Sequence, residues 1–424
     1  MARPNVTFKL NDLSIVGPQS EAPSTKCIGA MLSVNTVIAN LATFTERAAG
    51  MMLVPNTNDL YARLGNMVTT IAGGVTFLAG ITFYTKGECA ASYINGTYIG
   101  DGFTSGGGFS GSNALFSEEF WSINNFLEYG SPVYVGWGGI AGLCSGTVGS
   151  LALINDAICD VVFQGASGSV SNGGVRTVVE GKKSNELAVI GILNVPSVTT
   201  AITVVPNADG LTYADYHYTL VYGEKVHLGA NGADQTLITS ILAPDVAGCM
   251  VRTDRDYYPW YSPAGTKRGR ILSVARLKRS LTAAEQDLLY DGGINPVVTF
   301  SGEGTFLFGD KTTTPVASTL SRINVARLFI NLKKTLGAVA RRTLFEVNNA
   351  ATRSAFVSTA DKILETVKSQ NGISDYKVLC DESNNPVSVV EANEFYAEVM
   401  IKPLTSINFI TITLTNVDLE TALN

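Results

Sequence analysis

The stretch INVARLFINLKKTLGAVARR, residues 323–342, decides the fold of the C-terminal part of the chain. Its apolar side chains recur at helical spacing within one arc about 100° wide: Val325, Leu328, Phe329, Leu332, Leu336 and Val339. The opposite arc carries the basic residues Arg327, Lys334, Arg341 and Arg342. The pattern predicts a two-faced helix whose apolar face packs on a core and whose basic face meets something outside. A solvated basic face is the alternative.

The residues that follow predict a compact C-terminal α+β domain. A second helix is expected over about residues 350–368, and Gly372 is expected to close it. Its inward-facing residues are expected to be Phe356, Ile363, Leu364 and Val367. Three strand-like segments come next: Tyr376–Cys380, Glu394–Lys402 and Ile407–Leu414.

A single strand is expected near the N-terminus. Val6, Phe8 and Leu10 alternate there with Thr7 and Lys9. A lone strand in a polar arm is not stable by itself, so it needs the edge of a sheet, including that of another subunit.

The region between these parts alternates between helix and strand signals. A helix is expected over Glu118–Phe126, before a strand at Val133–Gly136, and a buried strand at Leu187–Leu193. The expected fold class is therefore a mixture of α/β and α+β in a multi-domain chain with extended N- and C-terminal β-arms. The expected layout is an arm over 1–20, an α/β region over 21–300 with a Gly- and Ser-rich outward portion near 100–240, an α+β domain over 301–404, and a strand and tail over 405–424.

The composition excludes a disordered chain. Of the 424 residues, 46 % are hydrophobic and only 16 % are charged, against about 25 % charged in typical proteins. The net charge of −6 gives no reason to expect nucleic-acid binding. Residues 252–342 carry 15 of the 30 basic groups and 7 of the 36 acidic ones, a local +8, which leaves −14 for the rest. Such a block is expected to face something acidic, in the same chain or in a partner.

Membrane insertion and enzymatic chemistry find no support in the sequence. The uncharged run Met67–Tyr84 contains four Thr and three Gly and has single basic flanks, which favours a buried passage over a membrane span. The N-terminus has no apolar signal core. The six cysteines form no CxxC pair and are expected to be reduced thiols. The two histidines lack partners at metal-ligand spacing, and no nucleophile elbow or complete P-loop occurs. No catalytic residue, cofactor or metal is expected.

Several motifs, in order, resemble those of contractile tail sheath proteins. The chain has a proline-led VAG at 244–248, then RTD at 252–254, SPAG at 262–265 and GINP at 293–296. The FGDKT stretch at 308–312 is similar to the family's WGARTL, with Phe for Trp and Asp-Lys for Ala-Arg. The C-terminal motifs follow the family's order and spacing: Ile323–Leu328, Phe345–Asn349, Thr352-Arg353, Gly372-Ile373, Cys380–Asn385, Ile401–Pro403 and Ser406–Ile410. The resemblance covers about residues 240–415, is weaker at 118–136, and is absent at 137–240.

The resemblance implies a structural subunit that stacks as six-membered rings around an inner tail tube and shortens to drive the tube through a host envelope. The implied partners are copies of itself, the tube protein, and baseplate and tail terminator proteins, with no nucleic acid and no membrane insertion. The implied location is the virion, after assembly in the bacterial host cytoplasm. A tailocin or another contractile injection or secretion system is the alternative, and an enzyme with an unrecognised site is a remote one.

The resemblance also assigns roles to particular residues. The terminal strands are implied to add to neighbouring subunits' sheets through Val6, Phe8, Leu10, Ile407, Phe409, Ile410, Ile412 and Leu414. An ordinary edge strand within the same subunit is the alternative for the C-terminal segment. The basic helix face (Arg327, Lys334, Arg341 and Arg342) is expected to face the tube or an acidic patch of the next subunit.

Overall fold

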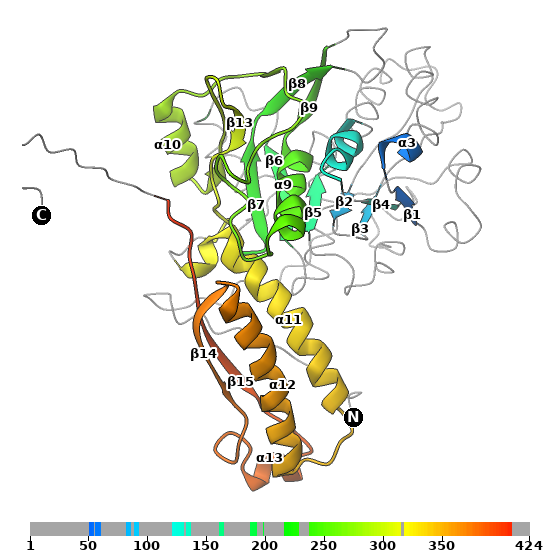
Figure 1. Cartoon of the computed structure of the whole chain (residues 1–424), viewed down its shortest axis with the longest axis vertical. Helices are drawn as coiled ribbons and strands as arrows, with labels where there is room; N and C mark the ends of the chain where they lie inside the picture. Colours follow the sequence, from blue (N-terminus) through cyan, green and yellow to red (C-terminus); the bar gives the residue numbers. More distant parts are fainter. Residues whose placement is uncertain are drawn as a thin grey trace, which may run out of the picture.

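The computed structural model of the protein describes most of the C-terminal half of the chain (Figure 1). The continuous ranges are 216–228, 237–314 and 318–408. The structure also describes helical residues 121–127 and the turn to residue 130. It further describes short segments at 51–54, 56–60, 82–85, 89–92, 133–136, 161–164, 187–192 and 198. The expected strand at residues 6–10 and the segment from 409 onward lie outside these ranges.

An eight-stranded mixed sheet forms the centre of the larger part of the molecule. Its strands, in spatial order, are β1 (Met51–Val54), β4 (Val133–Gly136), β3 (Cys89–Ser92), β2 (Thr82–Thr85), β5 (Val161–Gln164), β6 (Leu187–Ile192), β7 (Tyr218–Tyr222) and β11 (Ile294–Asn295). The pairs from β5 through β6 and β7 to β11 are parallel, whereas β2 pairs with β5 and β1 with β4 in antiparallel fashion. A short helix, α3 (Thr57–Leu60), follows β1. The predicted strands at 133–136 and 187–193 are confirmed, and so is the mixed helix and strand character of the chain.

The helix α9 (Ala243–Asp256) contacts β5 and β6. Pro244 lies in its first turn, where its missing N–H costs no helical hydrogen bond. Gly248 faces the Tyr129 ring, and a Cβ at this position would lie 2.3 Å from a ring carbon. The glycine of the VAG motif therefore lets α9 approach the segment of residues 121–130 closely.

A buried ion pair ties α9 to the smaller three-stranded sheet of β10 (Arg276–Leu277), β8 (Glu224–Leu228) and β9 (Leu237–Ile241). Lys225 Nζ lies 2.8 Å from Asp245 Oδ1, and both side chains are fully buried. The Lys225 ammonium also donates to the carbonyl of Leu272, and the Tyr129 hydroxyl donates to Asp245. These hydrogen bonds offset part of the cost of burying two charges, while Asp245 Oδ2 has no hydrogen-bond partner and burial raises the pKa of this carboxyl group.

A helix, a hairpin and a 3₁₀ helix come between this sheet and the C-terminal part in the sequence. The helix α10 (Ala283–Asp291) begins at a capping box in which Thr282 and Glu285 exchange hydrogen bonds between side chain and backbone. The hairpin β12 (Val297–Phe300) and β13 (Gly304–Leu307) follows. A short 3₁₀ helix, η5 (Thr319–Ser321), precedes the long helices.

The C-terminal part is an elongated unit of two long helices and a two-stranded sheet (Figure 1). It consists of α11 (Ile323–Thr343), α12 (Ala350–Ser369), β14 (Ile373–Leu379), α13 (Val387–Glu391) and β15 (Glu398–Pro403). Both predicted helices are confirmed. β14 begins three residues before the predicted strand, and β15 begins four residues after its predicted start.

The turn between α12 and β14 has the hydrogen bonds of a Schellman motif. The N–H of Gly372 donates to the carbonyl of Val367, and the N–H of Asn371 donates to that of Lys368. Asn371, with φ of 59°, occupies the left-handed position that is usually given to glycine. Gly372 is needed for a different reason, because a Cβ there would lie 2.6 Å from Val367 and 3.0 Å from the Trp260 ring.

Two features of the described residues bear on the exclusions made from sequence. None of the helices in the described ranges is long and apolar enough to cross a membrane. Cys249 and Cys380 are buried free thiols. Burial raises the pKa of the Cys249 thiol to about 12 and that of Cys380 to about 11, so both stay protonated at neutral pH.

The substitution Asp245→Asn should destabilise the protein strongly, because it leaves the buried Lys225 ammonium without its counter-charge. We expect a loss of about 3–5 kcal/mol in the free energy of unfolding, measured by urea denaturation. The matched control is Asp256→Asn, which breaks the exposed pair with Arg255 and should change stability by less than about 1 kcal/mol. Equal midpoints for the two variants would contradict this role of the buried pair.

Candidate assembly surfaces and the domain junction

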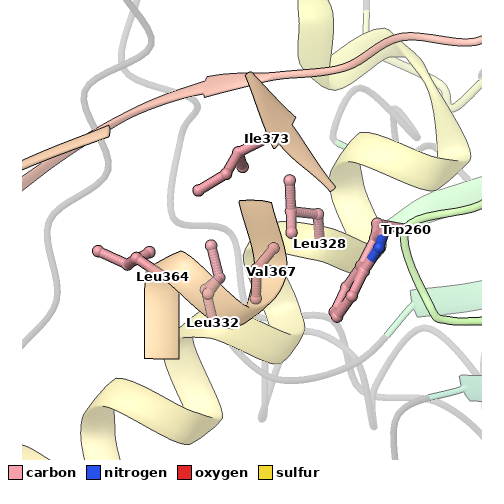
Figure 2. Close-up of a cluster of buried hydrophobic side chains, with 6 residues drawn as sticks. All are labelled: Trp260, Leu328, Leu332, Leu364, Val367 and Ile373. Atoms are coloured by element: carbon pink, nitrogen blue, oxygen red, sulfur yellow. The ribbon is translucent and has the colours of Figure 1, made fainter. Parts of the chain in front are cut away.

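Trp260 joins the C-terminal unit to the larger part of the molecule. It follows α9 and is buried in a cluster with residues of α11, α12 and β14: Leu328, Leu332, Leu364, Val367 and Ile373 (Figure 2). Its indole N–H donates to the carbonyl of Gln370 at 3.1 Å, and its own carbonyl accepts from the Asn324 side chain. An aromatic ring from one part therefore completes the core of the other.

An ion pair reinforces the same junction. Arg327 of α11 donates to both carboxylate oxygens of Asp254 in α9, at 2.7 and 2.5 Å, and to the carbonyl of Met250. The Arg327 side chain is 3 % exposed and that of Asp254 is 21 % exposed. A bidentate geometry of this kind fixes the guanidinium in orientation as well as in position. The RTD motif thus supplies the acidic partner for a residue 73 positions later.

The structure corrects the assignment of Arg327 to an outward basic face. The helical periodicity places this residue opposite the apolar arc, where a helix on the surface meets solvent. The first half of α11, however, lies between the α12–β14 unit on one side and α9 on the other, and its residues 323–328 are all buried. Helical spacing alone gives the direction of a side chain around the helix axis, but it does not show which neighbouring element packs on that side.

The remaining basic residues of the predicted face lie farther along α11. Lys334 is half-buried, whereas Arg341 and Arg342 are exposed in the last turn. Basic side chains at this position interact favourably with the carbonyl end of the helix dipole. The exposed basic feature of α11 is therefore an arginine pair at the end distant from the junction.

The sheet of β14 and β15 has two strands in the described part of the chain, so each strand has an unpaired outer edge there. Its inner face carries Tyr376, Val378, Val399 and Ile401, which pack on the cores of the unit and are only partly buried. Unpaired edges beside a partly covered apolar face are the features that allow a sheet to accept further strands.

The chain leaves β15 along the junction and is not a strand over residues 404–408. Ile407, predicted to lie in an inter-subunit strand, has an 83 % exposed side chain. The other predicted residues of the terminal strands lie outside the described ranges: Val6, Phe8, Leu10, Phe409, Ile410, Ile412 and Leu414. The inter-subunit role of these eight residues stays a prediction.

The sequence patterns did not single out two parts of the junction. Trp260 lies in a Tyr- and Pro-rich turn without periodicity, and only its size and apolar character signal a buried role. Asp310 replaces the alanine of the family's WGARTL, and its buried carboxylate bonds Arg322, Ser262, Ser406 and Asn408. The replacement of alanine by Asp310 in the family motif was the one sequence feature that could have indicated this buried carboxylate.

Comparison with known sequences finds that the C-terminal part is similar to tail sheath proteins. Residues 316–415 match the family model of the phage tail sheath C-terminal domain. The chain is 50 % identical over 171 residues to the tail sheath protein of Vibrio phage KVP40, and 47 % identical over 171 residues to that of Enterobacteria phage T4. The resemblance to contractile tail sheath proteins is confirmed. These alignments cover 40 % of the chain and 26 % of each relative, so the chain spans about a quarter of the tail sheath proteins that it matches.

Comparison with solved structures finds chains of similar fold in contractile particles. The PVC sheath complex of an extracellular contractile injection system, in its contracted state, aligns with a TM-score of 0.62 at 14 % identity, over 99 % of both chains. The anti-feeding prophage helical sheath, also contracted, gives 0.61 at 12 % identity, over 96 % of this chain and 99 % of the other. A chain of the anti-feeding prophage baseplate gives 0.61 at 13 % identity. At these identities the comparisons establish a shared fold.

Replacing Arg327 should weaken the junction, whereas replacing an exposed arginine of the same helix should not. Arg327→Gln leaves Asp254 without its bidentate partner, and we expect a loss of about 3 kcal/mol in unfolding free energy by urea denaturation. Arg341→Gln is the matched control and should stay within about 0.5 kcal/mol of the wild type. If both variants unfold at the wild-type midpoint, the ion pair does not stabilise the junction.

Proposed function

We propose that this chain is a structural subunit of a contractile sheath, most simply that of a bacteriophage tail. Copies of it would stack as hexameric rings around an inner tail tube and shorten to drive the tube through a host envelope. The observation that carries the proposal is the 50 % identity to a phage tail sheath protein over 171 residues. The fold shared with two contracted sheaths over at least 96 % of the chain supports it.

A sheath in a tailocin or another contractile injection or secretion system is a second candidate. One of the fold matches favours this candidate, because the PVC sheath belongs to an extracellular contractile injection system and aligns over 99 % of its length. Both candidates assign the same mechanical role to the chain, and they differ in what surrounds the sheath.

The open sheet of β14 and β15 supplies a physical basis for linking subunits. In this proposal the strand at Val6–Leu10 and the segment at Ile407–Leu414 add to the sheets of neighbouring subunits. Main-chain hydrogen bonds between strands would then connect the subunits while their bodies rotate as rigid units. The incomplete burial of Val378 and Val399 supports this role, because an added strand brings side chains that cover them.

The exposed arginine pair is assigned to a contact with an acidic surface of the tube or of the next subunit. Exposed charge pairs contribute about 0–1 kcal/mol each, so such a contact would hold in the extended sheath and release on contraction. The further partners are the baseplate and tail terminator proteins, and the location is the virion after assembly in the host cytoplasm. No catalytic step is needed, because the extended lattice would store the energy and release it as subunits pack more tightly.

Removal of residues 1–12 should abolish inter-subunit linkage without unfolding the body. We expect the purified full chain to form tubular polymers in negative-stain electron microscopy, and the truncated chain to remain as monomers or small oligomers with an unchanged unfolding midpoint. Absence of tubes in the full chain would contradict the sheath function. Full-length tubes from the truncated chain would show that the N-terminal strand is not an essential link.

Reversal of the exposed arginine pair tests the charged contact. The double variant Arg341→Glu/Arg342→Glu should reduce co-assembly with the inner tube protein of the same particle, measured as the fraction of tubes that carry a sheath. Because both side chains are exposed, the variant should fold normally. Lys267→Glu/Lys362→Glu, which reverses two exposed charges outside α11 and outside the open sheet, is the matched control. Equal sheath coverage in the wild type, the arginine variant and the lysine control would contradict this assignment.

A further inference from the structure

A single buried carboxylate accepts hydrogen bonds from four separate parts of the chain. Asp310 lies between β13 and α11 and is 2 % exposed. Its backbone is fixed by the neighbouring residue Lys311, whose N–H donates to the Asn295 side chain at 2.8 Å. The carbonyl of Asp310 accepts the N–H of Ile323, the first residue of α11. The position of this carboxylate is thus set by the body of the molecule.

Three of the contacts to the Asp310 carboxylate come from the body. Arg322 Nη1 donates to Oδ1 at 2.9 Å, and the Ser262 hydroxyl donates to Oδ2 at 3.2 Å. The Tyr290 hydroxyl makes a longer contact with Oδ1, at 3.5 Å. The Arg322 guanidinium supplies the counter-charge, and its side chain is 22 % exposed while that of Asp310 is 3 % exposed. The body alone therefore supplies a single donor to Oδ2, and one close donor and one long contact to Oδ1, so the carboxylate can accept further hydrogen bonds.

The C-terminal segment adds one further donor to each oxygen of the Asp310 carboxylate. The Ser406 hydroxyl donates to Oδ2, and the Asn408 amide donates to Oδ1 at 2.9 Å. The same amide also donates to the hydroxyl of Tyr290 in α10 at 2.7 Å. Burial, followed by the charge of Asp310, raises the pKa of Tyr290, so this hydroxyl keeps its proton and accepts from Asn408.

The segment is held in an extended form at its other end as well. The N–H of Leu404 donates to the carbonyl of Gly372, and the carbonyl of Leu404 accepts from Asn324 at 3.2 Å. Ser406 and Asn408 both turn toward Asp310, while Ile407 between them is 83 % exposed. This alternation is that of an extended chain with one face bound and the other free. Residues 404–408, called the stem below, thus run from β14 and α11 to the larger part of the molecule.

We propose that Asp310 is a positioning residue that clamps the stem, so that the C-terminal arm leaves its own subunit at a fixed point and in a fixed direction. This inference rests on the proposed sheath function, because the arm is the segment that would reach a neighbouring subunit. Because Ser406 and Asn408 are bound within their own subunit, this inference moves the start of the inter-subunit strand from Ile407 to residue 409. Tension on that link is then carried by charge-assisted hydrogen bonds to the subunit body. A fixed starting point also raises the effective concentration of the arm at the neighbouring sheet.

The test removes the two donors of the stem and leaves Asp310 and Arg322 in place. The variant Ser406→Ala/Asn408→Ala alters a surface segment, and Thr405→Ala, at an exposed position of the same stem, is the matched control. Dilute, unassembled full-length protein is digested with chymotrypsin, and mass spectrometry follows cleavage after Leu404. Cleavage after Phe409, beyond the clamp, is the internal reference. The same proteins are then allowed to polymerise and are imaged by negative-stain electron microscopy.

We expect cleavage after Leu404 to be at least tenfold faster in the double variant than in the control, and tubular polymers to be fewer and shorter. The cleavage rate follows the population of the released stem, which the lost hydrogen bonds increase. Equal cleavage rates would overturn the clamp, and so would faster cleavage with normal polymers. If the wild-type chain forms no tubes, the sheath function fails, while the cleavage rates still decide whether Asp310 clamps the stem.

Discussion

The contact between α9 and α11 is the constraint on which the rest of the C-terminal half depends. Trp260 inserts from the larger part into the core of the C-terminal unit, and Arg327 forms its bidentate pair with Asp254 beside it. Both contacts are needed to keep the two parts docked. Without the indole the core of the C-terminal unit would contain a cavity, and without Asp254 the buried guanidinium would be unpaired. The two parts therefore dock in one orientation. That orientation directs α12 and the open sheet away from the larger part (Figure 1).

The charge segregation seen in the sequence has a partly internal explanation. The basic block of residues 252–342 contains acidic partners of its own, as in the pairs Arg327–Asp254 and Arg322–Asp310, and Arg279 pairs with Glu285. Lys278 pairs with Glu224, just outside the block. The alternative of an acidic partner in the same chain thus accounts for these basic groups. The exposed remainder, including Arg341 and Arg342, is what is left for contacts with other molecules.

Sequence periodicity predicted the two long helices because each has to cover a core over five or more turns, which leaves a clear pattern. It could not predict what covers the other arc of α11, because α9 is brought there by contacts 73 residues distant in the chain. The same limit applies to the stem. Ser406 and Asn408 look like ordinary polar residues of a terminal segment, and only the fold places Asp310 opposite them. Local patterns thus revealed the elements, whereas the junctions depended on single side chains without periodicity.

The C-terminal unit combines a rigid attachment with an incomplete sheet, and the two properties require each other. A sheet with open edges gains hydrogen bonds from any added strand, so it has to be held where the correct strand arrives and kept from pairing at random. The junction at Trp260 fixes the sheet, and the stem at Asp310 fixes the start of the segment that leaves it. In the proposed sheath, these two points would hold the strand-accepting sheet and the strand-donating segment of one subunit at a constant separation. Copies that share this geometry would then pair only in a repeating arrangement, which is the physical requirement for a helical lattice.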